Sequence, residues 1–173
     1  MFNIDENFED EKFIVEMTQL KPISSIIIDQ VNKTNGAETA FIITVVPSTM
    51  IHRGDIFSID FPGEVDLPMV LNCSSDHMLK LGRLECQRSG ERTVQFTIMA
   101  PDQELLYTGV EFNLILNNAL NSPSLRPTSP FTSMMLTDSD RLELAGYTER
   151  IVLTNEVLGV IEPSTAEITQ TSY

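Results

Sequence analysis

Two cysteines and two histidines are the side chains of this 173-residue sequence best suited to hold a metal or act in nucleophilic chemistry. Cys73, His77 and Cys86 follow the spacing C-x3-H-x8-C, but no fourth ligand of the kind that zinc requires is evident. We therefore assign no metal site. The two cysteines flank a compact segment that contains Gly82, so they can close a disulfide in an oxidising compartment. Two independent buried thiols are the alternative.

Two sequons for N-linked glycans accompany the cysteines. They are Asn32-Lys33-Thr34 and Asn72-Cys73-Ser74, the second with cysteine in its middle position. Asn32 stands beside the turn-forming pair Asn35-Gly36, where a glycan would be accessible. We expect N-linked glycans if the chain is secreted, with Asn32 occupied more often than Asn72.

Motifs for enzymatic chemistry are missing from the sequence. The eight glycines form no G-x-G-x-x-G, no P-loop and no G-x-S-x-G elbow. His52 or His77 alone would suffice for a Ser-His-Asp triad, but nothing locates a nucleophile. Asp138-Ser139-Asp140 offers oxygen ligands that suit calcium, although an Asx turn explains it better, and the acidic cluster Asp60 to Asp66 is interpreted in the same way. We predict no catalytic residue, metal ligand or cofactor.

The charge of the chain limits its partners. With 25 acidic and 11 basic residues the formal net charge is −14, which would repel phosphate backbones and anionic membranes. No apolar run reaches the roughly 18 residues of a membrane-spanning helix. We expect neither nucleic acid as a partner nor insertion into a membrane. The first residues lack a secretory signal, which on its own favours the cytosol but is equally compatible with a fragment of a larger precursor.

The wider pattern is one of short alternating apolar segments separated by turn residues, with helical spacing almost absent. It predicts an all-β fold, an antiparallel Ig-like β-sandwich occupying residues 23–162. The expected core rows are Phe57/Ile59/Phe61, Val94/Phe96/Ile98 and Phe112/Leu114/Leu116. The expected strands are Ile26 to Val31, Ala40 to Val46, Asp55 to Phe61, Gly82 to Gln87, Thr93 to Met99, Val110 to Asn117, Phe131 to Thr137, Glu149 to Thr154 and Val157 to Ile161. Residues 117–132, with three prolines, are expected to form a long surface loop.

The two ends differ from the middle of the chain. Residues 1–22 are interpreted as an acidic arm with a candidate donor strand, and residues 163–173 as a polar tail or linker. Phe13, Val15 and Met17 alternate within residues 12–20, and we expect this segment to add as a β-strand to a neighbouring copy or module. An ordinary first strand of the same sandwich is the alternative.

The sequence resembles the β-sandwich modules that recur in very large cysteine-containing surface proteins of ciliated protozoa. The resemblance covers Ile23 to Val160 and rests on "ISSIIIDQVNKTNGAETAFIITVVPSTMIHRGDIFSIDFP", the cysteine pair, "TVQFTIM", "GVEFNLILNNALNSPS" and "PFTSMMLTDSD". The matching positions are Gly54, Ile56, Phe57, Ile59, Phe61 and Pro62, then Gly109, Phe112, Leu114, Asn118, Asn121, Ser122 and Pro123. The resemblance implies a secreted or cell-surface protein in which Cys73 pairs with Cys86 and the sequons are usable. It implies no ligand.

These observations together predict a non-enzymatic extracellular structural module of a cell-surface coat, appendage or filament. Its partners would be copies of itself or neighbouring modules of a larger surface protein. An extracellular recognition domain that binds carbohydrate or protein, with calcium in some cases, is the alternative, although without Trp only Tyr107 and Tyr147 offer aromatic faces to a sugar. A cytosolic enzyme is the third hypothesis.

Overall fold

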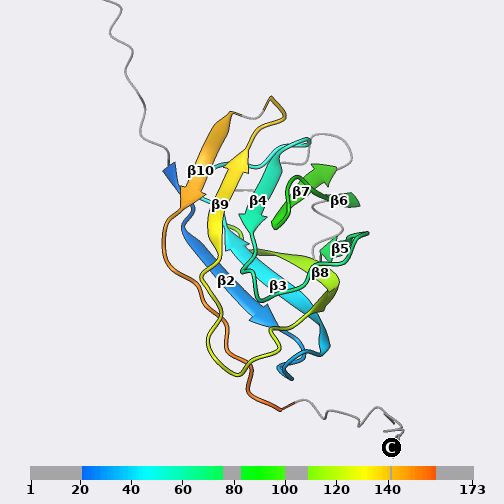
Figure 1. The fold of residues 1–173 in the computed structure, drawn as a ribbon. Helices are drawn as coiled ribbons and strands as arrows, with labels where there is room; N and C mark the ends of the chain where they lie inside the picture. The colour runs from blue at the N-terminus through cyan, green and yellow to red at the C-terminus, as the bar shows by residue number, and fades with distance from the viewer. Residues whose placement is uncertain (1–20, 76–82, 100–108, 141, 159–173) are drawn as a thin grey trace, which may run out of the picture.

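The computed structural model describes residues 21–75, 83–99, 109–140 and 142–158, and this part of the chain forms two stacked β-sheets (Figure 1). The six-stranded sheet has the order β1-β10-β9-β4-β7-β6 and the four-stranded sheet the order β2-β3-β8-β5. Neighbouring strands are antiparallel, except for β1 and β10, which are parallel. The predicted fold class is therefore confirmed.

The strands of the six-stranded sheet are β1 (Lys21–Pro22), β10 (Glu143–Tyr147), β9 (Thr132–Thr137), β4 (Ile56–Asp60), β7 (Thr93–Met99) and β6 (Arg83–Arg88). Those of the four-stranded sheet are β2 (Ser25–Gln30), β3 (Glu38–Val46), β8 (Phe112–Leu120) and β5 (Asn72–Ser75). The described residues include no helix long and apolar enough to cross a bilayer.

The core lies between the two sheets, where the period of two in each strand places one apolar row. All three predicted rows are buried, and β3 contributes the facing residues Phe41, Ile43 and Val45. Phe41, Phe61 and Phe131 meet edge to face, with ring centroids 5.1–6.5 Å apart. Each fully buried aromatic or branched side chain contributes about 1.5–3 kcal/mol, so these rows supply most of the hydrophobic stabilisation.

The Asn35-Gly36 pair lies in the connection of the β2–β3 hairpin, as its turn chemistry predicts, but the loop is longer than a two-residue turn. It runs from Val31 to Ala37, and the Ala37 amide donates to the Thr34 carbonyl at 3.3 Å. Gly36 has φ +67° while Asn35 does not have a positive φ. One left-handed residue at the third turn position is typical of a type II turn, which glycine permits without steric cost.

The predicted strand Glu149 to Thr154 is wrong: the last strand within the described residues is β10, which lies before it. Residues 149–158, which we call the C-terminal strap, run instead along the side of the sandwich next to β2 (Figure 1). The strap is held by backbone bonds from Thr128 to the Leu153 carbonyl (2.8 Å) and from Phe131 to the Ile151 carbonyl (2.9 Å). Leu153 and Asn155 are buried at alternate positions, as in a strand, but this segment packs against a loop and not against another strand.

The predicted surface loop is partly wrong as well. β8 continues to Leu120, and Asn121, Ser122 and Thr128 are buried. The Asn155 side-chain amide donates to the carbonyls of Ser122 (2.7 Å) and Ser124 (2.8 Å). Buried polar groups persist where they are hydrogen-bonded, so this polar segment packs under the strap rather than over the surface.

The two ends of the sandwich also differ from the sequence-based expectation. Lys21 and Pro22 form β1 instead of ending a preceding strand, so the described sandwich begins before residue 23. At the other end Val157 makes a single parallel bridge to Thr34, and no strand follows as far as Leu158. Residues 159–161 of that predicted strand, like Phe13, Val15 and Met17 of the candidate donor strand, lie outside the described residues.

Candidate interaction surfaces

Cys73 and Cys86 are joined by a disulfide, with their Cα atoms 6.1 Å apart. Cys73 lies on β5 and Cys86 on β6, so the bond connects the last strand of one sheet to the last strand of the other. A cysteine in a disulfide has no thiolate for a metal, which removes the two sulfur ligands of the C-x3-H-x8-C hypothesis. His77, its third residue, lies outside the described residues.

Asn32 is exposed in the loop after β2. Its side-chain oxygen accepts from the Thr34 amide at 3.0 Å, and its amide nitrogen donates to the Glu38 carbonyl at 3.2 Å. This Asx turn holds the sequon in a fixed loop conformation. The Asn32 amide group has two N–H donors, so a glycan on its nitrogen leaves one N–H for a hydrogen bond.

Asn72 is also exposed, but it lies within a strand. It is the first residue of β5 and stands opposite Asn117 of β8. Its sequon includes Cys73, whose sulfur is bonded to Cys86. The two sequons therefore differ in backbone geometry, one in a loop and the other in a paired strand.

The acidic clusters considered for calcium are occupied by hydrogen bonds within the protein. Asp138 accepts from the amides of Asp140 (2.9 Å) and Leu142 (2.8 Å), the pattern of an Asx turn. Asp60 accepts from the Thr93 hydroxyl at 2.6 Å. Among the described residues, no three His, Cys, Asp or Glu side chains come together in a way that could hold a metal.

Asp55 is the buried carboxyl next to one of the two histidines. Its carboxylate accepts from the His52 amide at 2.7 Å and lies 3.7 Å from the His52 Nδ1. Burial raises the pKa of the Asp55 carboxyl, and the bond from the His52 amide opposes this rise. The His52 side chain is exposed, and the carboxylate supports the loop that precedes β4. We interpret this pair as structural.

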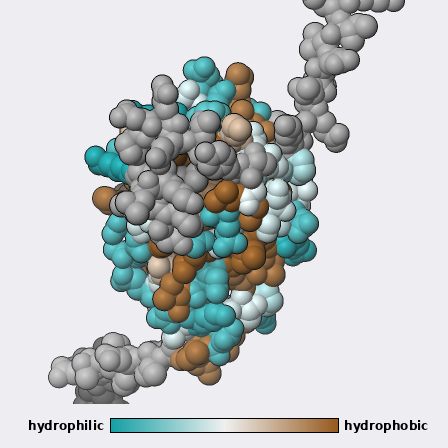
Figure 2. Space-filling view, turned by 180° about the vertical axis from the view of Figure 1, so that it is seen from behind, coloured by the Kyte–Doolittle hydropathy of each residue, from teal (hydrophilic) through white to brown (hydrophobic). Residues whose placement is uncertain are grey.

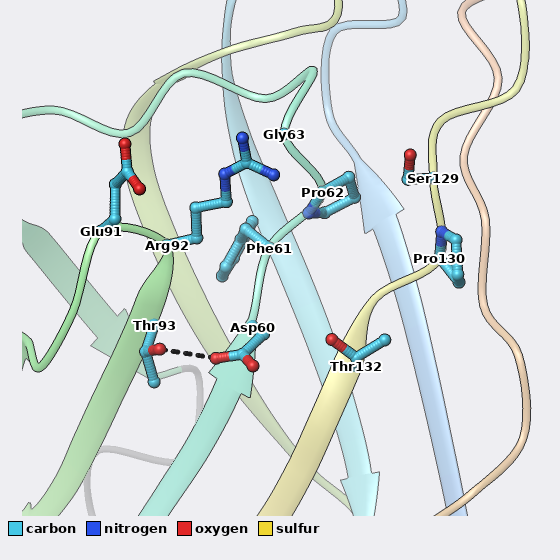
Figure 3. Close-up of a pocket in the computed structure, with 10 residues that line it drawn as sticks. All are labelled: Asp60, Phe61, Pro62, Gly63, Glu91, Arg92, Thr93, Ser129, Pro130 and Thr132. Carbon is cyan, nitrogen blue, oxygen red and sulfur yellow. Dashed lines mark hydrogen bonds between the residues drawn. The ribbon is translucent and has the colours of Figure 1, made fainter.

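An open groove of about 440 Å³ lies where β4, β7 and β9 meet their loops (Figure 3). Figure 3 shows Arg92, Glu91, Asp60 and Ser129 around it, with the Thr93–Asp60 hydrogen bond across neighbouring strands. Beside it Glu64 accepts from the Ser129 hydroxyl at 2.8 Å, a bond that lowers the pKa of Glu64. The Arg92 guanidinium occupies the space where a Cβ on Gly63 would stand. These contacts are those of a loop junction, and they do not bring an acid and a base to one reacting position.

The outer face of the four-stranded sheet carries an apolar row. Ile42 on β3 stands opposite Ile115 on β8, and Ile27 on β2 is the diagonal neighbour of Ile42. Ile27 is 60% exposed. The flanking groups are polar and include one charge: Asp29 on β2 stands opposite Ile42, and the Thr44 hydroxyl donates to the Asn113 side chain at 2.6 Å. Apolar side chains gather among polar ones near the middle of the molecule's rear side in Figure 2.

Sequence reasoning missed this row, although the signal was present. The runs Ile26-Ile27-Ile28, Phe41-Ile42-Ile43 and Leu114-Ile115-Leu116 are continuous, whereas strict alternation would place a polar residue at each centre. Each central isoleucine points to the outer face because its two neighbours fill the core. An apolar residue on both faces of three adjacent strands makes this outer face more apolar than a solvated sheet face usually is.

No family model and no curated protein matches the chain. Among solved structures, a cohesin from scaffoldin B of Acetivibrio cellulolyticus, crystallised with a dockerin, is similar at 11% identity over 76% of this chain and 98% of that one, with a TM-score of 0.44. The bacterial hydrophobin BslA is similar at 16% identity over 77% and 96% of the two chains, with a TM-score of 0.41. A non-cellulosomal cohesin of Archaeoglobus fulgidus is similar at 12% identity over 79% of this chain and 93% of that one, also with a TM-score of 0.41. These low scores describe the general form of a β-sandwich and do not define a family.

Proposed function

We propose that this chain is a non-enzymatic structural module of an extracellular surface assembly, joined to copies of itself or to neighbouring modules by β-strand addition. Residues 12–20 are the donor strand. The observation that carries the proposal is the pairing of β1 with β10, which leaves few partners for the residues that precede Lys21.

β1 gives residues 12–20 little to pair with in their own sheet. Lys21 stands beside Ala145 in parallel register, and β10 begins at Glu143, two residues before that partner. Continued in the same register, β10 offers partners to only two residues before Lys21. Met17 lies four positions before Lys21, and Val15 lies further still. The apolar face of this segment therefore needs another sheet, which a second molecule supplies.

Several features support the extracellular part of the proposal. The Cys73–Cys86 disulfide is of the kind that persists in oxidising compartments. Asn32 presents an exposed amide in a loop, where N-linked glycans are normally attached. The resemblance to modules of ciliate surface proteins agrees with both.

We expect glycopeptide analysis of the native protein to find Asn32 occupied more often than Asn72, because Asn72 lies in a paired strand beside the disulfide. Occupancy of Asn72 with Asn32 bare would reverse this ranking.

Sedimentation of the full chain over a range of concentrations tests the assembly. We expect oligomers that grow with concentration. The double substitution Val15→Glu and Met17→Glu should leave a folded monomer, because charges replace the apolar face of the donor. Thr18→Glu, on the opposite face of the same segment, is the matched control and should assemble normally. A full chain that stays monomeric, or a double variant that assembles like the wild type, would refute the proposal.

A second candidate function is recognition of a protein ligand by the outer face of the four-stranded sheet. The row Ile27, Ile42 and Ile115 favours it, because partly exposed apolar side chains with a polar border are typical of an interface centre. Ile115→Glu should abolish capture of such a ligand from native extracts and leave self-assembly unchanged. If Ile115→Glu blocks self-assembly instead, this face belongs to the assembly contact.

A further inference from the structure

β6 ends the six-stranded sheet on the side opposite β1, and its outer backbone groups face away from β7. The Ser89 amide donates to the Thr93 carbonyl at 3.1 Å, which fixes the phase of the ladder. Antiparallel pairs alternate, so Arg83, Glu85 and Gln87 bond to β7, whereas the amides and carbonyls of three other residues point outward. These three are Leu84, Cys86 and Arg88. Within the described part of the chain, no other segment hydrogen-bonds to their backbone groups.

The other sheet edges are short or covered. At β2 the Gln30 amide bonds to the Asp29 carboxylate at 2.8 Å, and the Ile26 amide bonds to the Tyr147 oxygen. The Gln30 side chain is tied to the strap through Asn155 at 2.9 Å. β1 has two residues and β5 has four. β6 has six residues, as many as β2, but its outward amides have no partner within the described chain, so its edge is open to another strand.

Apolar groups beside β6 are incompletely covered. Cys86, Cys73 and Leu71 are half-buried and pack against the core at this side of the sandwich. Met69 and Val70 are 90% and 84% exposed. They follow Leu67, whose carbonyl accepts from the Arg88 guanidinium at 3.4 Å, so they lie near the Arg88 end of β6. A strand added beside β6 with its apolar face inward would cover these groups.

The region around β6 is the basic part of an acidic chain. Between Lys80 and Arg92 the sequence has four of its 11 basic residues and only two acidic ones. Arg83 is 80% exposed at the side chain. Residues 1–12, which end at the first residue of the donor strand, carry five acidic residues and only one basic residue, Lys12. Opposite charges of this kind steer association and favour one docking edge over others.

We infer that the β6 edge of one molecule receives residues 12–20 of another, with Phe13, Val15 and Met17 directed toward the uncovered apolar groups. The inference rests on the proposed function and names the acceptor that it requires. Donor and acceptor are different surfaces of the same chain, so the contact is heterologous. It builds linear assemblies when the rotation between neighbours does not close a ring.

Cysteine crosslinking between two full-length variants tests the acceptor. In the proposed arrangement Ile14, Glu16 and Thr18 lie on the outer side, the side of Glu85 and Gln87, where neighbouring Cβ atoms are about 5 Å apart. A mixture of Glu16→Cys and Gln87→Cys should therefore form a disulfide-linked heterodimer under mild oxidation. A mixture of Glu16→Cys with Asp29→Cys, an exposed side chain on β2 of the other sheet, is the control and should not.

Two further variants sharpen the test. Arg83→Glu should weaken association by roughly fivefold at low salt, while Arg150→Glu, an exposed position away from β6, should not. Equal crosslinking to Gln87→Cys and Asp29→Cys, or none to Gln87→Cys in a wild type that assembles, would overturn the β6 inference and leave strand addition standing. A wild-type chain that never assembles would overturn the proposed function as well.

Discussion

Removal of the Cys73–Cys86 disulfide should lower the free energy of unfolding by about 3 kcal/mol. The bond closes a chain segment with a sequence separation of 13, and cross-linking a loop of this size removes about that much conformational freedom from the unfolded chain. Both sulfurs are only half-buried, so their truncation to alanine adds less than about 1 kcal/mol of lost apolar burial. The loss should be local in the folded state, because β5 is held otherwise by β8 alone among the described strands.

Urea unfolding of Cys73→Ala, Cys86→Ala and the double variant measures this loss. For slopes of about 1–3 kcal/mol per M, a loss of 3 kcal/mol lowers the midpoint by about 1–3 M. The three variants should be destabilised equally, because each breaks the same bond, so the single effects should not add. A double variant within about 1 kcal/mol of the wild type, or single losses that sum to the double loss, would refute this reasoning.

Three other substitutions test the packing. Burial raises the pKa of Asp55 in the folded state, so the wild type loses stability as pH rises through that pKa. Asp55→Asn does not ionise, and it should therefore become more stable relative to the wild type as pH rises. Urea unfolding at acidic and neutral pH measures this difference. Asn155→Ala should lower the free energy of unfolding by about 1–3 kcal/mol, because the carbonyls of Ser122 and Ser124 under the strap lose their hydrogen-bond donor. Thermal unfolding measures this loss, and Asn155→Asp, which also lacks the donor, is the comparison. Gly54→Ala should cost more than Gly36→Ala in the same assay: both have positive φ, but only at Gly54 would the Cβ meet a neighbour, at 3.2 Å.

The sequence predicted the strands whose two faces differ. Because one face of each is core, β7 matches its predicted limits and three others come close. β3 begins two residues earlier than predicted, β4 is one residue shorter at each end, and β8 begins two and ends three residues later. β10 was missed: Glu143–Tyr147 contains two small residues, Ala145 and Gly146, and shows little alternation. β5 was missed because it is short and polar. Its place depends on β8 and the disulfide, which are tertiary contacts.

The candidate surfaces were less predictable than the fold. Polar residues such as Asn121 and Thr128 indicated a surface loop, but their burial depends on hydrogen bonds to segments far away in the sequence. The open edge of β6 could not be predicted, since strand order, and thus which strand is last, is set by the packing of the whole sandwich. The donor segment stays a prediction, which rests on the alternation of its apolar residues.

Residue-resolved hydrogen exchange at low and high protein concentration tests strand addition at β6 most directly. Exchange slows where an amide gains a hydrogen bond. Our account predicts that the outward amides of Leu84, Cys86 and Arg88, together with amides of residues 12–20, become protected as concentration rises, while the covered amide of Gln30 does not change. Unchanged exchange at β6 and at residues 12–20 in a sample that has assembled would contradict it.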